Sequence, residues 1–215
     1  AYAMHKQEAD DVARMRAAAL GACTTYVLRP HIFAGATMQN YLVGALRGTV
    51  GGEGKLADNL RARGTRLPMV LPMGKEYMAK RFQFVHVDDM ARLIAWILRS
   101  GDRGGELITL NVAGRGDPIS IHTAARIAGQ KIVRLPSVAL CRVALAALWK
   151  LGISSVPPDS LPYMIGSYLM DTSRLRAFLG SGYTDVIRYT TEDALRDTFS
   201  PTLKAAEPIT RSASA

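Results

Sequence analysis

Apolar residues recur along the chain with two different periods, and stretches of the two kinds alternate. Residues 23–28 (Cys-Thr-Thr-Tyr-Val-Leu) are β-branched and apolar, which indicates a buried strand. Residues 83–87 and 107–112 have the same character and predict two more strands. Stretches rich in Ala, Leu, Met and Arg, such as residues 6–20 and 138–151, predict helices. Single strands interleaved with helices predict an α/β fold with a parallel sheet.

Particular residues predict where these elements begin and end. Pro30 lacks a backbone N–H and is expected to end the first strand, which leaves residues 31–35 as a turn or loop. A side-chain oxygen just before an apolar run can accept from the free N–H groups at a helix start. Three such positions predict N-caps: Thr37 before residues 38–46, Asp88 or Asp89 before a helix to residue 98, and Ser120 before residues 121–128.

The bulk composition indicates a folded, basic protein. Of the 215 residues 48% are hydrophobic and 21% charged, which excludes a wholly disordered chain and suits one globular unit or two lobes. The formal net charge is +9, from 27 Lys and Arg against 18 Asp and Glu. Because no run of five like charges occurs, a basic soluble protein is favoured over a nucleic-acid-binding one.

The cysteines, the tryptophans and the most apolar window point to a cytoplasmic protein. Cys23 and Cys141 are far apart, with no metal-binding spacing, and are expected to be reduced, buried thiols. Trp96 and Trp149 are expected in the core. No signal peptide is recognised, and charges and a proline interrupt residues 135–153, so a buried helix is favoured over a membrane-surface helix, and both over a membrane span.

Tyr2 and Lys6 are the first candidates for chemistry. On a helix that includes both, their side chains lie one turn apart on the same face. A phenol beside an ammonium can act as a general acid or base, because the positive charge favours the phenolate and lowers the pKa of the tyrosine. Taken alone this spacing is common on solvated helices, and the motifs that follow along the chain change its interpretation.

Five motifs in order give the chain its resemblance to a known family. They are Tyr2-x-x-x-Lys6, Leu28-Arg29-Pro30, residues 84–91 (Phe-Val-His-Val-Asp-Asp-Met-Ala), residues 110–114 (Leu-Asn-Val-Ala-Gly) and residues 171–175 (Asp-Thr-Ser-Arg-Leu). In this order the chain resembles the extended short-chain dehydrogenase/reductase family, in its NAD-dependent epimerase/dehydratase group. The resemblance runs from residue 1 to about residue 199.

The resemblance implies a fold, a cofactor and a division of the chain. The fold would be the C-terminal part of a Rossmann-like doubly wound parallel sheet plus a small, mostly helical substrate lobe. Residues 1–35 and 83–115 would be the remainder of the dinucleotide-binding domain, residues 36–82 and 116–199 the substrate-binding lobe, and residues 200–215 a flexible tail. The cofactor would be NAD or NADP, and the partner a small-molecule substrate, with a homodimer permitted.

The resemblance also implies site residues. Tyr2 would be the general acid/base in hydride transfer at a hydroxyl or carbonyl carbon, and Lys6 would hold the nicotinamide ribose and lower the pKa of Tyr2. Tyr2, Lys6, Pro30 and His31 would contact the cofactor. The substrate-contacting candidates are Ile32, Asn40 and Tyr41, of which Asn40 and Tyr41 could equally be surface residues.

Departures from the family pattern refine these expectations. The glycine-rich first turn, the residue that selects NAD or NADP, and the upstream Ser or Thr are absent, so the chain is expected to lack an N-terminal half and residues 1–215 alone to bind NAD(P) poorly. Ile32 stands where sugar-nucleotide enzymes often have Asn, and Arg81 is one residue out of register. Both departures count against a sugar-nucleotide substrate. Ile32, Phe33, Met38, Tyr41 and Leu42 would suit a more apolar one, such as a sterol-like or lipid alcohol.

Alternative roles remain open for the chain and for two of its residues. A non-catalytic binding or assembly protein, including one that binds RNA, is compatible with the charge of +9 but gives the Tyr2/Lys6 pair no purpose. His86 is expected to hydrogen-bond a neighbouring turn rather than to take part in catalysis, and Arg29 to fix a strand end.

Overall fold

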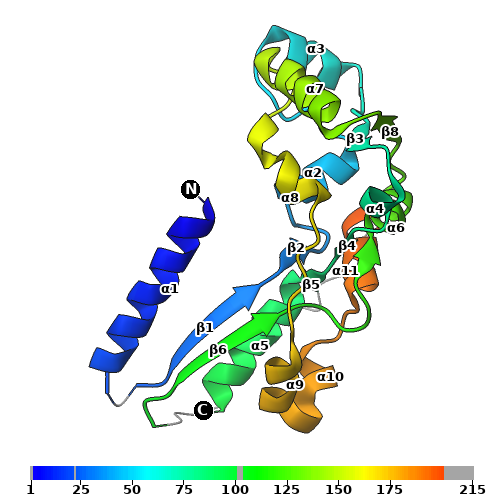
Figure 1. Ribbon diagram of the computed structural model, residues 1–215. Helices are drawn as coiled ribbons and strands as arrows, with labels where there is room; N and C mark the ends of the chain where they lie inside the picture. The colour runs from blue at the N-terminus through cyan, green and yellow to red at the C-terminus, as the bar shows by residue number, and fades with distance from the viewer. Residues whose placement is uncertain (1, 22, 101–103, 201–215) are drawn as a thin grey trace, which may run out of the picture.

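The computed structural model describes residues 2–21, 23–100 and 104–200, with the side chains of residues 2 and 3 excepted. The flexible tail predicted for residues 200–215 lies outside the described residues beyond Ser200. Helix α1 (Tyr2–Ala19) leads into strand β1 (Thr25–Pro30), which pairs in parallel with β6 (Leu107–Val112). Figure 1 shows α1 standing beside this strand pair, away from the rest of the molecule.

A pair of charged side chains holds α1 against the strands. Arg29 of β1 donates from Nη2 to Oδ2 of Asp10 at 2.5 Å, and Arg14 donates to the same carboxylate at 3.1 Å. The hydrogen bond from Arg29 is the main reason that the pKa of Asp10 lies below its usual value, with that from Arg14 second. Arg29 thus has the structural role that its place at the strand end predicts.

The chain does not turn after Pro30, contrary to the prediction for residues 31–35. It continues into β2 (Ile32–Ala34), which pairs in parallel with β5 (Phe84–His86). The N–H groups of Thr25 and His31 both point to β6, donating to Glu106 O and Val112 O. Because donors alternate sides along a strand, the nitrogen of Pro30 faces away from β6, and the proline removes no hydrogen bond from this ladder.

The remaining elements form an upper lobe and a set of helices below the strands (Figure 1). We call residues 41–78 and 121–165 the upper lobe. It contains α2 (Tyr41–Arg47), α3 (Lys55–Ala62), β3 (Met69–Pro72), α4 (Lys75–Met78), α6 (Ile121–Ile127), β8 (Ile132–Leu135), α7 (Val138–Lys150) and α8 (Leu161–Ile165), with β3 and β8 paired in parallel. Between lobe and strands lie β4 (Arg81–Phe82) and β7 (Ile119–Ser120), an antiparallel pair. The other helices are α5 (Val87–Arg99), α9 (Ser173–Leu179), α10 (Tyr183–Val186) and α11 (Thr191–Phe199), with short 3-10 turns at Pro158–Ser160 and Gly180–Gly182.

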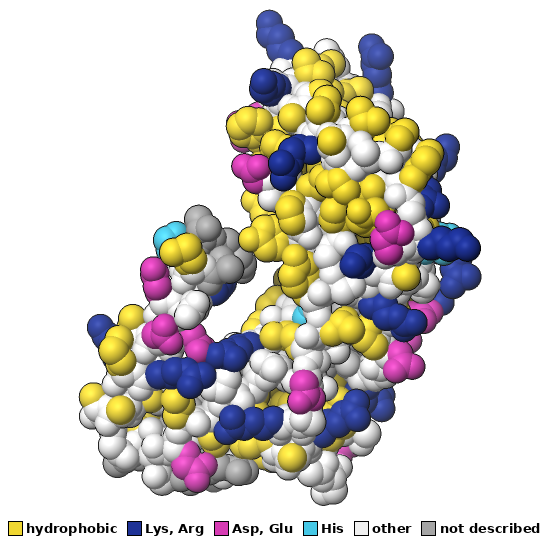
Figure 2. Space-filling model, viewed as in Figure 1, with side chains coloured by type: hydrophobic (Ala, Val, Ile, Leu, Met, Phe, Trp, Pro, Cys, Tyr) yellow, Lys and Arg dark blue, Asp and Glu magenta, His cyan; other side chains and the backbone are white. Residues whose placement is uncertain are grey.

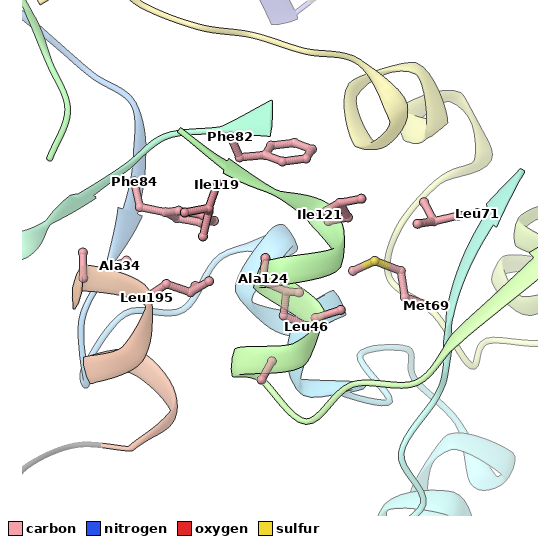
Figure 3. Close-up of a cluster of buried hydrophobic side chains, with 13 residues drawn as sticks. Ala34, Leu46, Met69, Leu71, Phe82, Phe84, Ile119, Ile121, Ala124 and Leu195 are labelled. Atoms are coloured by element: carbon pink, nitrogen blue, oxygen red, sulfur yellow. The ribbon is translucent and has the colours of Figure 1, made fainter. Parts of the chain in front are cut away.

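Two clusters of buried apolar side chains hold these parts together. One joins the upper lobe to β2, β5 and α11; among its members are Ala34, Leu46, Met69, Phe84, Ile121 and Leu195 (Figure 3). The other packs one face of β6, through Ile108, Leu110 and Val112, against α5, α9 and α10. The chain is therefore an α/β protein with parallel strand pairs and a mostly helical lobe, and the predicted fold class is confirmed.

Two of the three predicted N-caps are wrong, and one is confirmed. Ser120 caps α6 by accepting from Thr123 N, as predicted. Asn40, not Thr37, caps α2, because its Oδ1 accepts from Val43 N while its Nδ2 donates to Phe33 O. His86, not Asp88 or Asp89, caps α5 through Nδ1, which accepts from Asp88 N at 3.1 Å. In both cases the cap is a residue that also bonds another segment, which the local sequence does not reveal.

Several residues predicted to be buried are not. Each residue of β1 is only half-buried, because β1 pairs with β6 alone among the strands that the structure describes. Cys23 is exposed just before β1, whereas Cys141 is buried as predicted. Trp149 is 49% exposed and lies on a helix, α7, whose outer face is largely in solvent. Trp96 packs edge-on against Phe178 in the second cluster.

Within the described ranges no helix is both long and apolar enough to cross a membrane.

Candidate functional site

The carboxyl ends of β1 and β6 meet at one edge, where parallel sheets commonly bind ligands. Pro30 and His31 follow β1 there, and residues 168–171 cross the same edge as a strap. Asn111 of β6 donates to Asp171 O at 3.1 Å. Gln83 holds Met170 from both sides, donating to its carbonyl at 3.2 Å and accepting from its N–H at 2.7 Å. The strap therefore closes part of the edge beside the predicted cofactor-contacting residues.

His31 lies under this strap. Its Nε2 hydrogen-bonds Tyr168 O, so this nitrogen carries the proton and the ring is placed as a donor. Burial is the main cause that lowers the pKa of His31, and the bond to Tyr168 opposes the shift. The neutral imidazole is the form that this position favours.

The stability of the protein is expected to depend on pH through His31. A histidine whose pKa is lower in the folded state binds its proton more readily when unfolded, so stability is lost as pH falls below about 6.5, the value of an unperturbed histidine. Urea denaturation of wild type and His31→Gln from about pH 8 to about pH 5 measures this. Below about pH 6.5 we expect the free energy of unfolding to fall less steeply with pH in the variant than in wild type. Equal slopes in the two proteins would contradict the lowered pKa of His31.

Tyr2 and Lys6 lie on the first turns of α1. The backbone of Tyr2 begins the helix, but its side chain falls outside the described part of the chain. Lys6 is exposed one turn further on. Figure 2 shows the molecule hollowed between α1 and the upper lobe, so the predicted pair lies on a helix that borders open space. The predicted contact between the two side chains stays a prediction.

A cavity of about 710 Å³ lies in the upper lobe. Its wall is formed by α2, by β3 with the two residues before it, by the end of α7 and by residues 154–156. Asn40 and Tyr41, two of the predicted substrate residues, line it; Ile32 does not and instead packs against the cluster of Figure 3. A volume of this size suits a small-molecule ligand.

The wall of this cavity is mainly apolar. Val43, Met69, Leu145, Leu148 and Met164 contribute apolar side chains. Polar groups come from Asn40, Thr49, Ser154 and Ser155. No motif in the sequence points to Ser154 and Ser155, because they enter the wall only through the packing of residues 152–155 on Gly51 and Gly52.

That packing depends on two glycines approaching another backbone. Gly52 N donates to Ile153 O at 3.0 Å. A Cβ at Gly52 would lie 2.0 Å from Gly152 O, and one at Gly51 would lie 2.6 Å from the hydroxyl of Ser155. The glycine-rich connection thus forms a fixed side of the cavity.

His86 lies outside this cavity, in a buried hydrogen-bond network. Its Nε2 is 3.1 Å from Oδ2 of Asp197 on α11, and its ring stacks on Tyr189 at 3.7 Å. Burial is the main cause that raises the pKa of Tyr189. His86 therefore links β5 to α5 and α11, and the structural role predicted for it is confirmed.

The sequence has no match among protein-family models or among curated proteins. Solved structures resemble the chain at low identity. UDP-glucose 4-epimerase from Thermus thermophilus, in complex with NAD, is 17% identical with a TM-score of 0.46, over 83% of this chain and 47% of its own. The human epimerase family protein SDR39U1 (isoform 2), with NADPH, is 14% identical with a TM-score of 0.45, over 82% and 48%. UDP-N-acetylglucosamine 4-epimerase from Bacillus cereus is 13% identical with a TM-score of 0.38, over 81% and 42%. The chain spans less than half the length of each.

Proposed function

We propose that the chain is the C-terminal part of an NAD(P)-dependent oxidoreductase or epimerase that acts at a hydroxyl or carbonyl carbon. One observation carries the proposal: helix α1, with Tyr2 and Lys6 one turn apart in sequence, passes directly into β1, which pairs in parallel with β6. A helix leading into a parallel strand is the unit from which dinucleotide-binding sheets are built. NAD and NADP remain alternatives, because the residue that distinguishes them is expected on a strand that precedes this unit.

The unpaired edge of β1 supports the proposal that the chain is part of a larger sheet. Among the described residues β1 has β6 as its single neighbour, and its other edge is bare. Apolar side chains of α1, including Met4, Val12 and Met15, are exposed beside it. An open edge next to an exposed apolar helix favours association with further strands. In this proposal the residues present would hold the nicotinamide end of a dinucleotide, whereas the glycine-rich turn that would hold its diphosphate is not in the sequence.

The division of the chain follows the same proposal. Residues 1–35 and 83–115 would complete the cofactor-binding domain, and residues 36–82 and 116–199 the substrate lobe. The cavity lies entirely in the second set. Helices α9 and α10 belong to the second set and pack against β6. They cover the face of the strand pair on which Ile108 and Leu110 lie.

Each candidate residue then has a defined task. A bound nicotinamide would supply or accept the hydride. Tyr2 would give a proton to, or take one from, the substrate oxygen at its phenol oxygen. Lys6 would hold the nicotinamide ribose and keep the Tyr2 phenolate accessible. Pro30 and His31 would lie along the nicotinamide at the carboxyl end of β1, where the Nε2–H of His31 is already donated to Tyr168 O and its Nδ1 is left as an acceptor.

The substrate in this proposal is an apolar alcohol or ketone. Most of the cavity wall is apolar, and Arg47 is the one charged residue in the wall as the structure describes it. Its guanidinium donates to Thr198 O at 3.3 Å and lies over the Phe199 ring. A sugar diphosphate needs charge-assisted bonds, which this wall offers poorly. Asn40 and Tyr41 would contact the substrate hydroxyl or its neighbours.

Cofactor binding by the full-length polypeptide tests the proposal. Removing the ammonium in Lys6→Ala is expected to weaken NADH or NADPH binding by roughly 10- to 100-fold, the range for a hydrogen bond to a charged group. Arg16→Ala removes an exposed cation from the far end of the same helix and is the matched control, with binding expected at the wild-type level. Titration of cofactor fluorescence measures both. Equal affinities of the two variants would reject the role of Lys6.

A further inference from the structure

Helix α7 is apolar on two opposite faces. Cys141 and Leu145 are buried on its inner face, where they pack on β3, β8 and α8. On the outer face, Leu140, Val143 and Leu151 are 47%, 64% and 58% exposed. With the exposed Ala147 they follow one another at intervals of three or four residues, so they form a single stripe along the helix. We call this stripe the outer face of α7. Nothing in the described part of the chain covers it.

The surroundings of the outer face are basic. From Pro118 to Pro158 the sequence holds five Lys or Arg and no Asp or Glu. Two of these, Arg142 and Lys150, are exposed on α7 itself, and Lys150 lies seven residues after Val143 on the same side. On the neighbouring α3, Lys55 and Arg63 are exposed as well.

Acidic groups near this surface are few and partly paired. Asp58 of α3 is bonded to Arg61 at 2.5 Å, and Glu53 precedes the helix. Figure 2 shows apolar and basic side chains intermingled over the upper end of the molecule, where Figure 1 places α3 and α7. The upper end therefore combines exposed apolar area with an excess of positive charge.

We propose that the outer face of α7 docks on a lipid bilayer with anionic headgroups and lies parallel to its surface. A helix that is apolar all round needs a second apolar neighbour. With 13 residues α7 is too short to span a bilayer, which takes about 20 residues. Shallow insertion of Leu140, Val143 and Leu151 would bury the stripe, while Lys150, on the same side of the helix, would reach the headgroups. This inference does not depend on the proposed enzymatic activity.

The positive charge around the outer face favours an anionic bilayer over a second copy of the chain or a nucleic acid. In a symmetric dimer through the outer face, the same surface meets itself, which would bring Lys150 of both copies into the interface with no acidic residue on α7 to pair with it. A nucleic acid would satisfy the cations but would leave the apolar stripe in water. An anionic bilayer satisfies both features at once.

A tryptophan placed in the stripe provides a direct readout. The native tryptophans do not serve, because Trp149 lies nine residues after Leu140, on the side of α7 away from the stripe, and Trp96 is partly buried against the second cluster. In the full-length protein, Val143→Trp with Trp96→Phe and Trp149→Phe leaves one reporter within this chain, and Trp96→Phe with Trp149→Phe alone is the blank. With vesicles of phosphatidylcholine and phosphatidylserine, we expect a blue shift of the reporter emission that the blank lacks. Vesicles of phosphatidylcholine alone should give a much weaker shift.

Surface variants test which residues carry the binding. Leu140→Ser with Val143→Ser is expected to lower co-sedimentation with anionic vesicles by about tenfold. Leu98→Ser, at an exposed apolar position on α5, is the matched control and should bind like wild type. Lys150→Glu should weaken the preference for anionic vesicles, whereas Arg142→Glu, on the side of α7 away from the stripe, should change it less. Circular dichroism of each variant shows that the fold is kept.

Four results would overturn the proposal. They are no binding to anionic vesicles, equal binding to both vesicle types, unchanged binding of the Leu140→Ser/Val143→Ser variant, and a blue shift of the Val143→Trp reporter with rising protein concentration in the absence of lipid. The last result would assign the outer face to a second copy of the chain.

Discussion

Replacing Tyr2 by Phe is expected to lower the turnover of the full-length protein by roughly 10²- to 10⁴-fold, the usual contribution of one general acid or base. The variant keeps the ring and loses only the hydroxyl that would carry the proton. Binding of NADH or NADPH should stay within about twofold of wild type, because in this account Lys6, and not Tyr2, holds the ribose. Single-turnover kinetics separate the chemical step from binding and product release.

A tyrosine elsewhere on the surface provides the control for this variant. Tyr163 is exposed on α8 and is absent from the wall of the cavity, so Tyr163→Phe should leave turnover unchanged. If both variants turned over at the wild-type rate, Tyr2 would have no role in proton transfer. If Tyr2→Phe lost cofactor binding along with turnover, its role would be structural instead.

Replacing Asp89 by Ala is expected to destabilise the protein by about 3–5 kcal/mol, the usual cost of removing one member of a buried ion pair. Asp89 is fully buried near the start of α5. Its carboxylate accepts from the N–H groups of Arg188 and Tyr189 at 3.0 and 3.1 Å and pairs with Arg92. Alanine would leave two backbone donors and a guanidinium without their acceptor. Urea denaturation followed by circular dichroism measures the change in the free energy of unfolding.

Asp88 is the matched control for this prediction, because it is the adjacent residue and its side chain is 59% exposed. Asp88→Ala should cost less than about 1 kcal/mol, the contribution of an exposed carboxylate near a helix start. Equal destabilisation by the two substitutions would mean that the buried network around Asp89 does not hold the C-terminal helices in place.

Much of the fold was predictable because its signals are local. The run of residues 107–112 is strand β6 with the predicted bounds, and Ser120 caps α6 through a bond three residues away. The wrong predictions concern pairing across long distances. The strand at residues 32–34 depends on β5, some fifty residues later, and Asn40 becomes the cap of α2 because it also holds Phe33. Such bonds leave no pattern in the neighbouring sequence.

The candidate site was predictable only in part, for a similar reason. Asn40 and Tyr41 line the cavity, and Pro30 and His31 lie at the carboxyl end of β1, whereas their contacts with substrate and cofactor stay predictions. Ile32 is partly buried and packs against the core cluster, because the chain continues into β2. The composition of α7 predicted a buried helix, since periodicity reports how apolar each face is and not whether another element covers it.

The most direct measurement is a crystal structure of the full-length protein with NAD or NADP bound. We expect the phenol of Tyr2 and the ammonium of Lys6 to point to the same side of α1, with Lys6 within hydrogen-bonding distance, about 3 Å, of the nicotinamide ribose. Tyr2 should face the reactive carbon of the ring. A cofactor bound elsewhere, or Tyr2 and Lys6 turned to different sides of the helix, would contradict the account.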